Sequence, residues 1–212
     1  MSLFARCYDR CMAATERGGL GEWRRELLAT LTAEQADPEV LELGAGTGVN
    51  LGHYPPGLGR LVQTEPDLGM LEQLTERAQG RASEAAGVSA LALPYPDESF
   101  DAVVATLVLC TVPDPTLALR EAARVLRPGG RLLFIEHVGS SEPRVRRWQG
   151  RVEPVWKLLA SGCHLTRDPR PLLVQAGLEL ESCQEDFLPK APSLVSPAIR
   201  GVARRLSFRP RA

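Results

Sequence analysis

The stretch "VLELGAGTGVN", residues 40–50, decides the fold because it joins an apolar run to three closely spaced glycines. The run has the composition of a strand buried on both faces, with one acidic residue, Glu42, inside it. Gly44, Gly46 and Gly48 permit tight turns and let a ligand lie against backbone amides at the start of the next helix. The spacing is GxGxG rather than the GxGxxG of dinucleotide-binding proteins. An ordinary tight connection without a ligand is the alternative interpretation.

Strand-like and helix-like segments alternate along the rest of the chain. Helical spacing of apolar residues predicts helices over 20–31 and 115–126, and one that begins near Asp67. Apolar runs predict further strands at 60–65, 82–90, 100–110, 131–138 and 178–187, with an antiparallel strand within 194–206. Strands that are almost continuously apolar and separated by helices indicate a parallel sheet covered on both faces.

Length and composition limit the class of protein. With 212 residues, 44% of them apolar and 24% charged, the chain suits a single domain spanning 1–212. Charged residues near the start and a longest uncharged apolar run of only 102–113 predict a cytoplasmic protein with neither a signal peptide nor a transmembrane segment. The five cysteines are odd in number and form no CxxC pair, which argues against a disulfide framework and against a zinc or other metal site.

The end of the chain is basic. After Asp186 there are no acidic residues, whereas one lysine and five arginines follow. Such a segment can contact nucleic acid or an anionic membrane surface. Phe208 is the one aromatic residue interleaved with these arginines, so a solvated edge is the favoured interpretation and nucleic-acid binding is not expected. Peripheral membrane contact stays open, and no feature of the sequence predicts an oligomeric state.

Five segments together resemble the class I S-adenosylmethionine-dependent methyltransferases. They are "VLELGAGTGVNL", "TEPD", "LPYPDESFDAVVATLVLCTVPDP", "REAARVLRPGGRLLFIEHV" and "GCHLTRD". The chain is most similar to the branch that contains the animal alkyl-thiol methyltransferases and their soluble bacterial relatives, and quinone-ring methyltransferases share the "RVLRPGGRLL" style. The animal enzymes carry a hydrophobic N-terminal anchor, which this sequence does not show.

The resemblance implies an α/β, Rossmann-like fold. Its sheet has seven mostly parallel strands in the order 3-2-1-4-5-7-6, with helices on both faces. Residues 1–36 are then an N-terminal helical cap, and residues 140–170 are an insertion or lid on the acceptor side.

The resemblance also implies a site for S-adenosylmethionine, with S-adenosylhomocysteine as the product. Glu42 orients the methionine amino group of the cofactor, above the turn formed by Gly44, Ala45, Gly46 and Gly48. Glu65 accepts hydrogen bonds from the ribose hydroxyls, a role that its place at the end of the second strand also suggests. Further cofactor contacts are expected from Pro66 beside the adenine, the Thr106 carbonyl beside the methionine portion, and Tyr8 closing the pocket.

The end of the third strand departs from the family pattern. Many relatives have an aspartate there that receives the adenine amino group, and alignment places Ser89 at this position. Ser89 can accept the same hydrogen bond, and the backbone of Ala90 and Leu91 supplies the remaining contacts. Weaker or less selective cofactor binding follows from this replacement.

The exit of the fourth strand, "TLVLC", predicts an apolar acceptor. It lacks the Asp/Asn, two prolines and aromatic residue of enzymes that methylate exocyclic amines of bases, and the chain has no Pro-Cys pair for cytosine C5 chemistry. Displacement at a sulfonium methyl depends mainly on in-line positioning and exclusion of water. His137 is the first candidate base, and Glu136 and His164 are the further catalytic candidates. The alternative for His137 is a histidine that fixes the neighbouring loop. His164 is expected to line the acceptor pocket from the lid.

The lid is predicted to contain an amphipathic helix. Its apolar residues are expected to cover the acceptor, and its arginines to face solvent or a membrane surface: Trp148, Val152, Val155, Trp156 and Leu159 against Arg144, Arg146, Arg147 and Arg151. The sequence therefore predicts S-adenosylmethionine-dependent methyl transfer to a small lipophilic acceptor, with a thiol favoured. The alternatives are a quinone-ring or other carbon or oxygen methyltransferase, and a nonenzymatic cofactor-binding or nucleic-acid-binding protein on the same fold.

Overall fold

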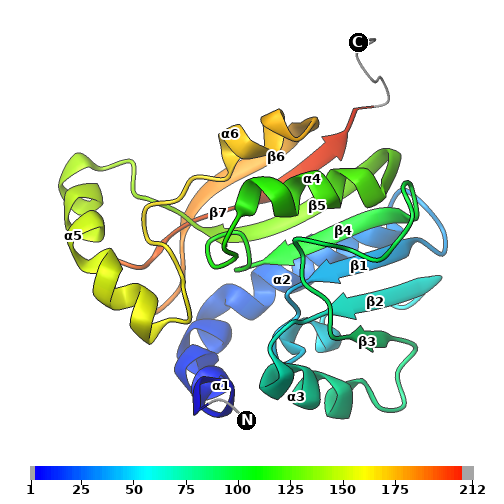
Figure 1. Ribbon diagram of the computed structural model, residues 1–212, viewed down its shortest axis with the longest axis horizontal. Helices are drawn as coiled ribbons and strands as arrows, with labels where there is room; N and C mark the ends of the chain where they lie inside the picture. The colour runs from blue at the N-terminus through cyan, green and yellow to red at the C-terminus, as the bar shows by residue number, and fades with distance from the viewer. Residues whose placement is uncertain (1–2, 207–212) are drawn as a thin grey trace.

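The computed structural model describes residues 3–206, with side chains from residue 9 onward, and contains one seven-stranded sheet (Figure 1). The strand order is β3-β2-β1-β4-β5-β7-β6, which confirms the predicted topology. Neighbouring strands run parallel from β3 to β5, and β7 is antiparallel to both β5 and β6. The strands are β1 (Glu39–Leu43), β2 (Arg60–Thr64), β3 (Glu84–Ala86), β4 (Phe100–Thr106), β5 (Leu126–His137), β6 (Leu178–Phe187) and β7 (Pro197–Arg205).

Two of the helices, α3 and α4, begin at an aspartate side chain that caps them. Asp67 accepts the Met70 amide at 2.9 Å at the start of α3, and Asp114 accepts the Leu117 amide at 3.0 Å at the start of α4. The helices are α1 (Leu3–Thr15), the π-helix η1 (Glu16–Leu20), α2 (Gly21–Ala29), the 3-10 turns η2 (Thr30–Thr32) and η3 (Val49–Gly52), α3 (Leu68–Ala78), α4 (Pro115–Val125), α5 (Pro143–Leu159) and α6 (Arg170–Gln175). Within the described residues, no helix is both long and apolar enough to span a membrane.

Two local predictions were wrong. The helix expected after the glycine turn is only the four-residue 3-10 turn η3, because the prolines at 55 and 56 cannot donate the amide bonds that an α-helix needs. The fourth strand ends at Thr106 rather than 110, because Leu107 adopts a left-handed backbone with φ of 59° that cannot continue a strand.

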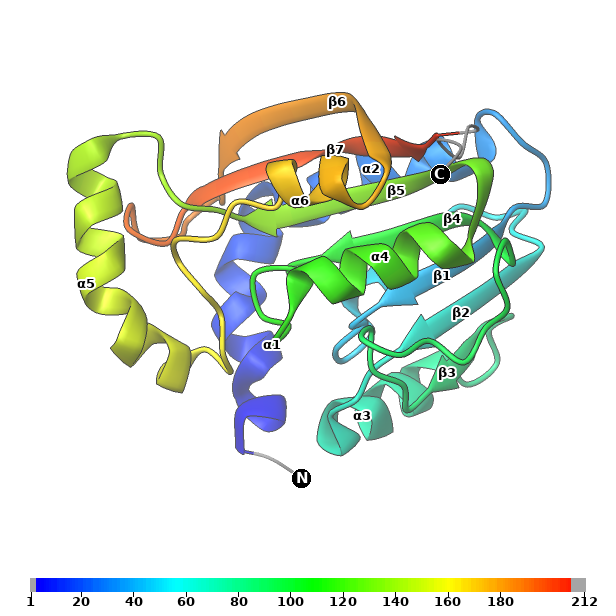
Figure 2. The same cartoon turned by 45° about the horizontal axis from the view of Figure 1, so that its top comes forward.

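The core lies on both faces of the sheet, as Figure 2 also shows for the helices that cover it. Alternate residues of β1 point to opposite faces, as the pleat of a strand requires. Leu41 and Leu43 pack with α4 and α6 on one face, whereas Val40 packs with α2 and α3 on the other. The apolar run of β1 is therefore buried on both sides, as its composition predicted.

The arginines of the basic C-terminal segment that are described pair with acids. Arg200 pairs with Glu26 at 2.8 Å, Arg205 pairs with Glu98 at 3.2 Å, and Arg204 pairs with Glu34 and Glu181. Phe208, Arg209 and Arg211 lie outside the described residues. The described part of the segment forms β7, which lies between β5 and β6, so the prediction of a solvated edge was wrong for these residues.

Substitution of Gly201 tests how closely β7 packs between β5 and β6. A Cβ atom there would lie 2.1 Å from the Ser182 carbonyl oxygen, so we expect Gly201→Ala to lower the free energy of unfolding by about 3 kcal/mol. Gly150 on α5 has open space around it, and Gly150→Ala should leave stability unchanged or raise it by up to about 1 kcal/mol. Urea denaturation followed by circular dichroism measures both, and equal stabilities of the two variants would contradict the packing.

Candidate cofactor and acceptor site

The glycine turn after β1 is held against the end of β2. Gly44, Gly46 and Gly48 have φ values of 54°, 60° and 85°, a region that favours glycine. The Ala45 amide donates to the Thr64 carbonyl at 2.9 Å, and the Gly46 amide donates to the Glu65 carboxylate at 2.9 Å. The turn is thus shaped by left-handed glycines and fixed to the neighbouring strand, at the carboxyl edge where ligands bind in such sheets.

Glu65 is a nearly buried carboxylate that accepts backbone amides. It is 6% exposed and accepts the Gly46 amide and, at 2.8 Å, the Asp67 amide. Burial raises the pKa of Glu65, and the two amide hydrogen bonds oppose the rise. Each carboxylate oxygen has a further lone pair. The remaining lone pairs of the Glu65 carboxylate therefore fit a ligand with two hydroxyl donors, such as the ribose of S-adenosylmethionine.

Glu42 lies beneath the turn, surrounded by donors. It is 1% exposed and accepts from Asn50 at 2.7 Å, Tyr54 at 2.9 Å and Gln63 at 2.6 Å. Burial raises the pKa of Glu42, and hydrogen bonds from Gln63, Asn50 and Tyr54 oppose the rise. These contacts give Glu42 a structural role in fixing the turn from below, and its predicted contact with the cofactor stays a prediction.

Arg24 extends this network to the N-terminal helices. It is 3% exposed, and its guanidinium donates to Asn50 at 2.8 Å and to the Thr106 hydroxyl at 2.9 Å. It also pairs with Glu16 at 3.0 Å. The sequence analysis did not identify Arg24 or Asn50, because an arginine on an amphipathic helix and an asparagine after a glycine turn are ordinary at the surface. The Thr106 hydroxyl is therefore engaged, and only its carbonyl was predicted to meet the cofactor.

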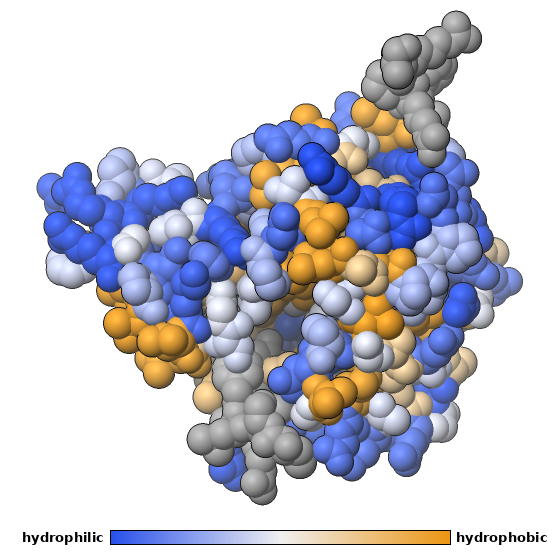
Figure 3. Space-filling model, in the orientation of Figure 1, coloured by the Kyte–Doolittle hydropathy of each residue, from blue (hydrophilic) through white to orange (hydrophobic). Residues whose placement is uncertain are grey.

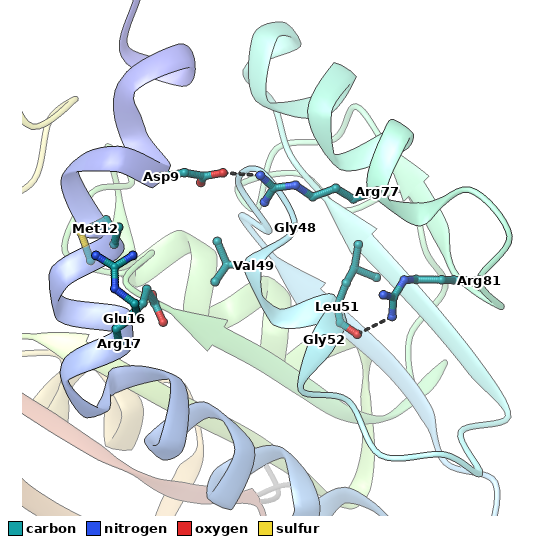
Figure 4. A pocket seen from close by; sticks show the side chains of 11 residues that line it. Asp9, Met12, Glu16, Arg17, Gly48, Val49, Leu51, Gly52, Arg77 and Arg81 are labelled. Atoms are coloured by element: carbon teal, nitrogen blue, oxygen red, sulfur yellow. Dashed lines mark hydrogen bonds and ion pairs between the residues drawn. The ribbon is translucent and has the colours of Figure 1, made fainter.

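Helix α1 is fastened across the glycine turn. The Thr47 hydroxyl donates to Asp9 at 2.7 Å, Arg77 donates to Thr47 at 3.1 Å, and Arg77 pairs with Asp9 (Figure 4). A cavity of about 440 Å³ lies between α1 and α3, and among the residues whose side chains are described Gly48 is the one predicted cofactor residue that lines it. The cavity thus adjoins the turn without reaching Glu65. Tyr8 is on α1, and its side chain lies outside the described ones.

The remaining predicted adenine contacts lie in the loop after β3 and, for Pro66, at the end of β2. The Leu91 amide donates to the Ser89 hydroxyl at 3.2 Å, so Ser89 and Leu91 are bonded to each other. Ala90 is buried at 5% exposure, and Pro66 is exposed at the end of β2. The Glu65 amide donates to the Ala86 carbonyl at 3.0 Å, which places this loop beside Glu65. Their contacts with adenine stay predictions.

Glu136 holds the loop that follows β4. Its carboxylate is fully buried and accepts the amides of Val108 and Leu109 at 2.9 Å and of Cys110 at 3.1 Å. Because the Glu136 carboxylate already accepts these three amides, Glu136 fixes the conformation of the loop. These contacts do not favour the predicted catalytic role. Leu107, with its left-handed backbone, begins the same loop.

His137 is buried beneath the lid. It is 4% exposed, and neither ring nitrogen has a hydrogen-bond partner within the described residues. Cys163 is a neighbouring polar group whose pKa is lowered to about 5, chiefly by Cys110 and further by His137 and Trp156, against the effect of burial. His137 is thus a buried imidazole beside the Cys163 thiol, and its role as a base stays a prediction.

The segment after α5 is fastened to the loop after β4. The His164 amide donates to the Cys110 carbonyl at 2.8 Å, and Arg167 donates to the carbonyls of Leu109 at 3.0 Å and Val112 at 2.6 Å. The His164 ring contacts Glu153 of α5 at 3.1 Å, so it ties α5 to this segment. The structure thus brings His137, Glu136 and the His164 segment to one region, with the His164 ring engaged in holding the lid.

One prediction about the lid was wrong. Of the five apolar residues expected to cover the acceptor, Trp148, Val155 and Leu159 are 57%, 59% and 69% exposed. Val152 and Trp156 are half-buried on the inner side. The inner side of α5 is instead attached by polar groups, so apolar side chains remain outside.

Comparisons with known proteins agree with this geometry. Residues 41–134 match the Methyltransferase domain family. Thiol S-methyltransferase TMT1B of Rattus norvegicus is 36% identical over 195 residues, covering 84% of this chain and 78% of that protein. Demethylmenaquinone methyltransferase of Mycobacterium sp. (strain JLS) is 38% identical over 134 residues, covering 62% of this chain and 55% of that protein. The structure of YcgJ from Bacillus subtilis superposes with a TM-score of 0.73 at 17% identity, covering 88% of this chain and 99% of that one.

The sheet order, the glycine turn and Glu65 define a class I S-adenosylmethionine-dependent methyltransferase. The chain belongs to the methyltransferase family that includes TMT1B, with which it aligns over most of its length.

Glu65 provides a test of the cofactor site. Glu65→Gln removes the negative charge from the hydroxyl acceptors, and a charge-assisted hydrogen bond contributes on the order of 1.5 to 3 kcal/mol. We expect the dissociation constant for S-adenosylhomocysteine, measured by calorimetry, to rise about 10-fold to 100-fold. Glu72→Gln changes an exposed carboxylate on α3 and is the matched control. Unchanged affinity in a folded Glu65→Gln protein would remove Glu65 from the site.

The buried Glu136 makes the stability of the fold depend on pH. Burial raises its pKa to about 7, although amide bonds from Leu109, Val108 and Cys110 oppose the rise. Because the folded-state pKa exceeds the unfolded value of about 4.3, the stability from the bound proton is full below that value and is lost as the pH rises through about 7.

In the wild type, deprotonation of Glu136 should lower the free energy of unfolding by up to about 3 kcal/mol between about pH 4.5 and 7.5. We expect this decrease to be absent in Glu136→Gln. Urea denaturation at each pH measures it. Glu142→Gln, at the exposed N-cap of α5, is the control. Identical pH profiles for wild type and Glu136→Gln would contradict the role of burial.

Proposed function

We propose that this methyltransferase transfers a methyl group from S-adenosylmethionine to the sulfur of a small lipophilic thiol. The observation that carries the proposal is the loop after β4, where Val108, Leu109 and Cys110 are buried and apolar while Glu136 is bonded to their amides. Such a loop suits an acceptor that is apolar and brings its own nucleophile. The similarity to proteins named thiol S-methyltransferases supports the same acceptor class.

The bound cofactor supplies an electrophilic methyl group on a sulfonium. Glu65 holds the ribose, and the turn of Gly44, Ala45, Gly46 and Gly48 supports the methionine portion. Residues 1–36 cap this side, a role supported by the bonds from Asp9 and Arg24 to the turn and its network. Residues 140–170 cover the acceptor, a role supported by the bonds of Arg167 to the loop after β4.

Positioning is the main catalytic contribution of the chain. A thiol with an ordinary pKa of about 8.5 already has some thiolate at neutral pH, so its nucleophile needs little activation. The buried loop after β4 excludes water and aligns the sulfur with the methyl group. His137, whose ring nitrogens are unpartnered within the described residues, accepts the thiol proton where the acceptor enters protonated.

A quinone-ring methyltransferase is the second candidate. It is supported by the similarity to demethylmenaquinone methyltransferase over 62% of this chain. A ring carbon needs a base to remove its proton, and His137 is the group available for that step.

A turnover assay decides between the candidates. We expect S-adenosylhomocysteine to form with short alkyl and aryl thiols and not with phenols or quinone precursors of similar size. Wild-type turnover only with a quinone precursor would favour the second candidate, and no turnover with any acceptor would overturn the proposed function.

The pH dependence of a histidine variant tests the role of positioning. For a thiol, we expect His137→Ala to lower kcat/KM modestly, and the loss to shrink as the pH rises above the thiol pKa of about 8.5, where the acceptor is already ionised. For a carbon acceptor the loss should be about 100-fold or more. His164→Ala is the comparison, because its ring is bonded to Glu153. A large loss with a thiol at every pH, with cofactor binding intact, would establish an essential histidine instead.

A further inference from the structure

Helix α5 is attached to the rest of the protein by polar groups. Gln149 is fully buried, donates to the Leu194 carbonyl at 3.0 Å and accepts the Ser140 amide at 2.8 Å. One turn further on, Glu153 accepts the Thr166 amide at 2.8 Å and contacts the His164 ring at 3.1 Å. The inner face of α5 therefore includes buried polar groups beside the half-buried Val152 and Trp156, whereas the inner face of an ordinary amphipathic helix is mainly apolar.

The outer face carries the apolar side chains. Trp148, Val155 and Leu158 follow one another at helical spacing and are 57%, 59% and 86% exposed, and Leu159 beside them is 69% exposed. Figure 3 shows the resulting apolar patch over the second half of α5, next to the hydrophilic first half. Single exposed apolar residues are normal, whereas a contiguous exposed group marks an interaction surface.

Arginines flank this patch on the same face. Arg144, Arg147 and Arg151 are exposed at the helical spacing of Trp148 and Leu158, and among the described residues they form no ion pair. The Arg151 guanidinium lies 5.1 Å from the centre of the Trp148 ring. Glu153, the acidic residue within α5, faces inward. The outer face thus combines positive charge with apolar side chains and contains no acid.

We propose that this outer face of α5 binds an anionic membrane surface. Unpaired arginines are attracted to anionic headgroups, and tryptophan and leucine side chains enter the boundary between headgroups and acyl chains. A protein partner with an acidic, apolar groove would satisfy the same groups, but helix α5 stands away from the sheet, so its outer face is accessible to a planar surface (Figure 2).

Membrane binding would place the acceptor side of the protein at the lipid surface. The segment after α5 is bonded to the loop after β4 through the His164 amide and Arg167. A lipophilic acceptor concentrated in the bilayer then has a short path to this loop. The binding itself does not depend on which acceptor is methylated.

Co-sedimentation with vesicles tests the proposal. We expect the full-length protein to bind vesicles of phosphatidylcholine with phosphatidylserine more tightly than vesicles of phosphatidylcholine alone. Leu158→Glu should weaken the binding about tenfold or more, because it removes an exposed leucine that would enter the membrane and adds a charge that anionic lipid repels. Leu68→Glu makes the same change at a residue of α3 that is 78% exposed, and should bind as wild type does.

The charged part of the face has its own test. Arg147→Gln and Arg151→Gln together should reduce binding to the anionic vesicles, and Arg120→Gln, an exposed arginine of α4, should not. Raising the ionic strength from about 0.1 M to about 1 M shortens the screening length from about 10 Å to about 3 Å, and should remove the preference for anionic lipid.

Three results would overturn the proposal. They are no vesicle binding by the wild type, equal loss of binding in Leu158→Glu and Leu68→Glu, and a wild-type dimer in sedimentation velocity that Leu158→Glu dissociates. The last result would assign the face to a second copy of the chain. Calorimetry with S-adenosylhomocysteine checks that every variant keeps its cofactor site, so a failure of membrane binding is separate from a failure of the proposed function.

Discussion

The buried hydrogen bonds among Arg24, Asn50, Thr106 and Glu42 are the interaction on which the site depends. They join the N-terminal helices to β1, to the turn after it and to the end of β4. A charge in such a position is tolerated only when it is paired and its remaining groups are bonded, and removing one partner costs about 3 to 5 kcal/mol. Glu16 pairs with Arg24, and Gln63 and Tyr54 complete the shell of Glu42. The helical cap and the sheet edge are therefore held in one arrangement.

A second constraint is the use of carboxylates to fix loops at the sheet edge. Glu65 accepts one amide within the glycine turn and the amide of Asp67 before α3, Glu136 accepts three amides after β4, and Glu121 accepts the Leu93 amide at 2.8 Å. Charge-assisted bonds of this kind are stronger than neutral ones. They give three irregular loops defined shapes without regular secondary structure, which is what an enzyme that works by positioning requires.

Helix α5, on the proposed acceptor side, is attached to the domain in a different way. The loop after β4 is apolar inside, yet α5 is attached through Gln149 and Glu153 and exposes four large apolar side chains: Trp148, Val155, Leu158 and Leu159. A cover attached by a few hydrogen bonds is more easily separated from the domain than one attached by a packed apolar face. The same arrangement leaves the outer face of α5 exposed, which is the face that we propose binds a membrane surface.

The resemblance to a known family predicted the strand order, whereas the sequence by itself determined the alternation of strands and helices, the position of the glycine turn and the acid at the end of β2. These follow from short-range signals: apolar runs, glycines that tolerate positive φ, and caps such as Asp67 and Asp114. Only the tertiary structure decided which way polar side chains point. Arg24 and Asn50 have no local signature of burial, because their partners are 8 to 82 residues away. Trp148 and Val155 matched an inward apolar stripe, but Gln149 and Glu153 found buried partners and turned the helix the other way. A buried polar group must find a partner, and that partner is set by the fold rather than by neighbouring residues.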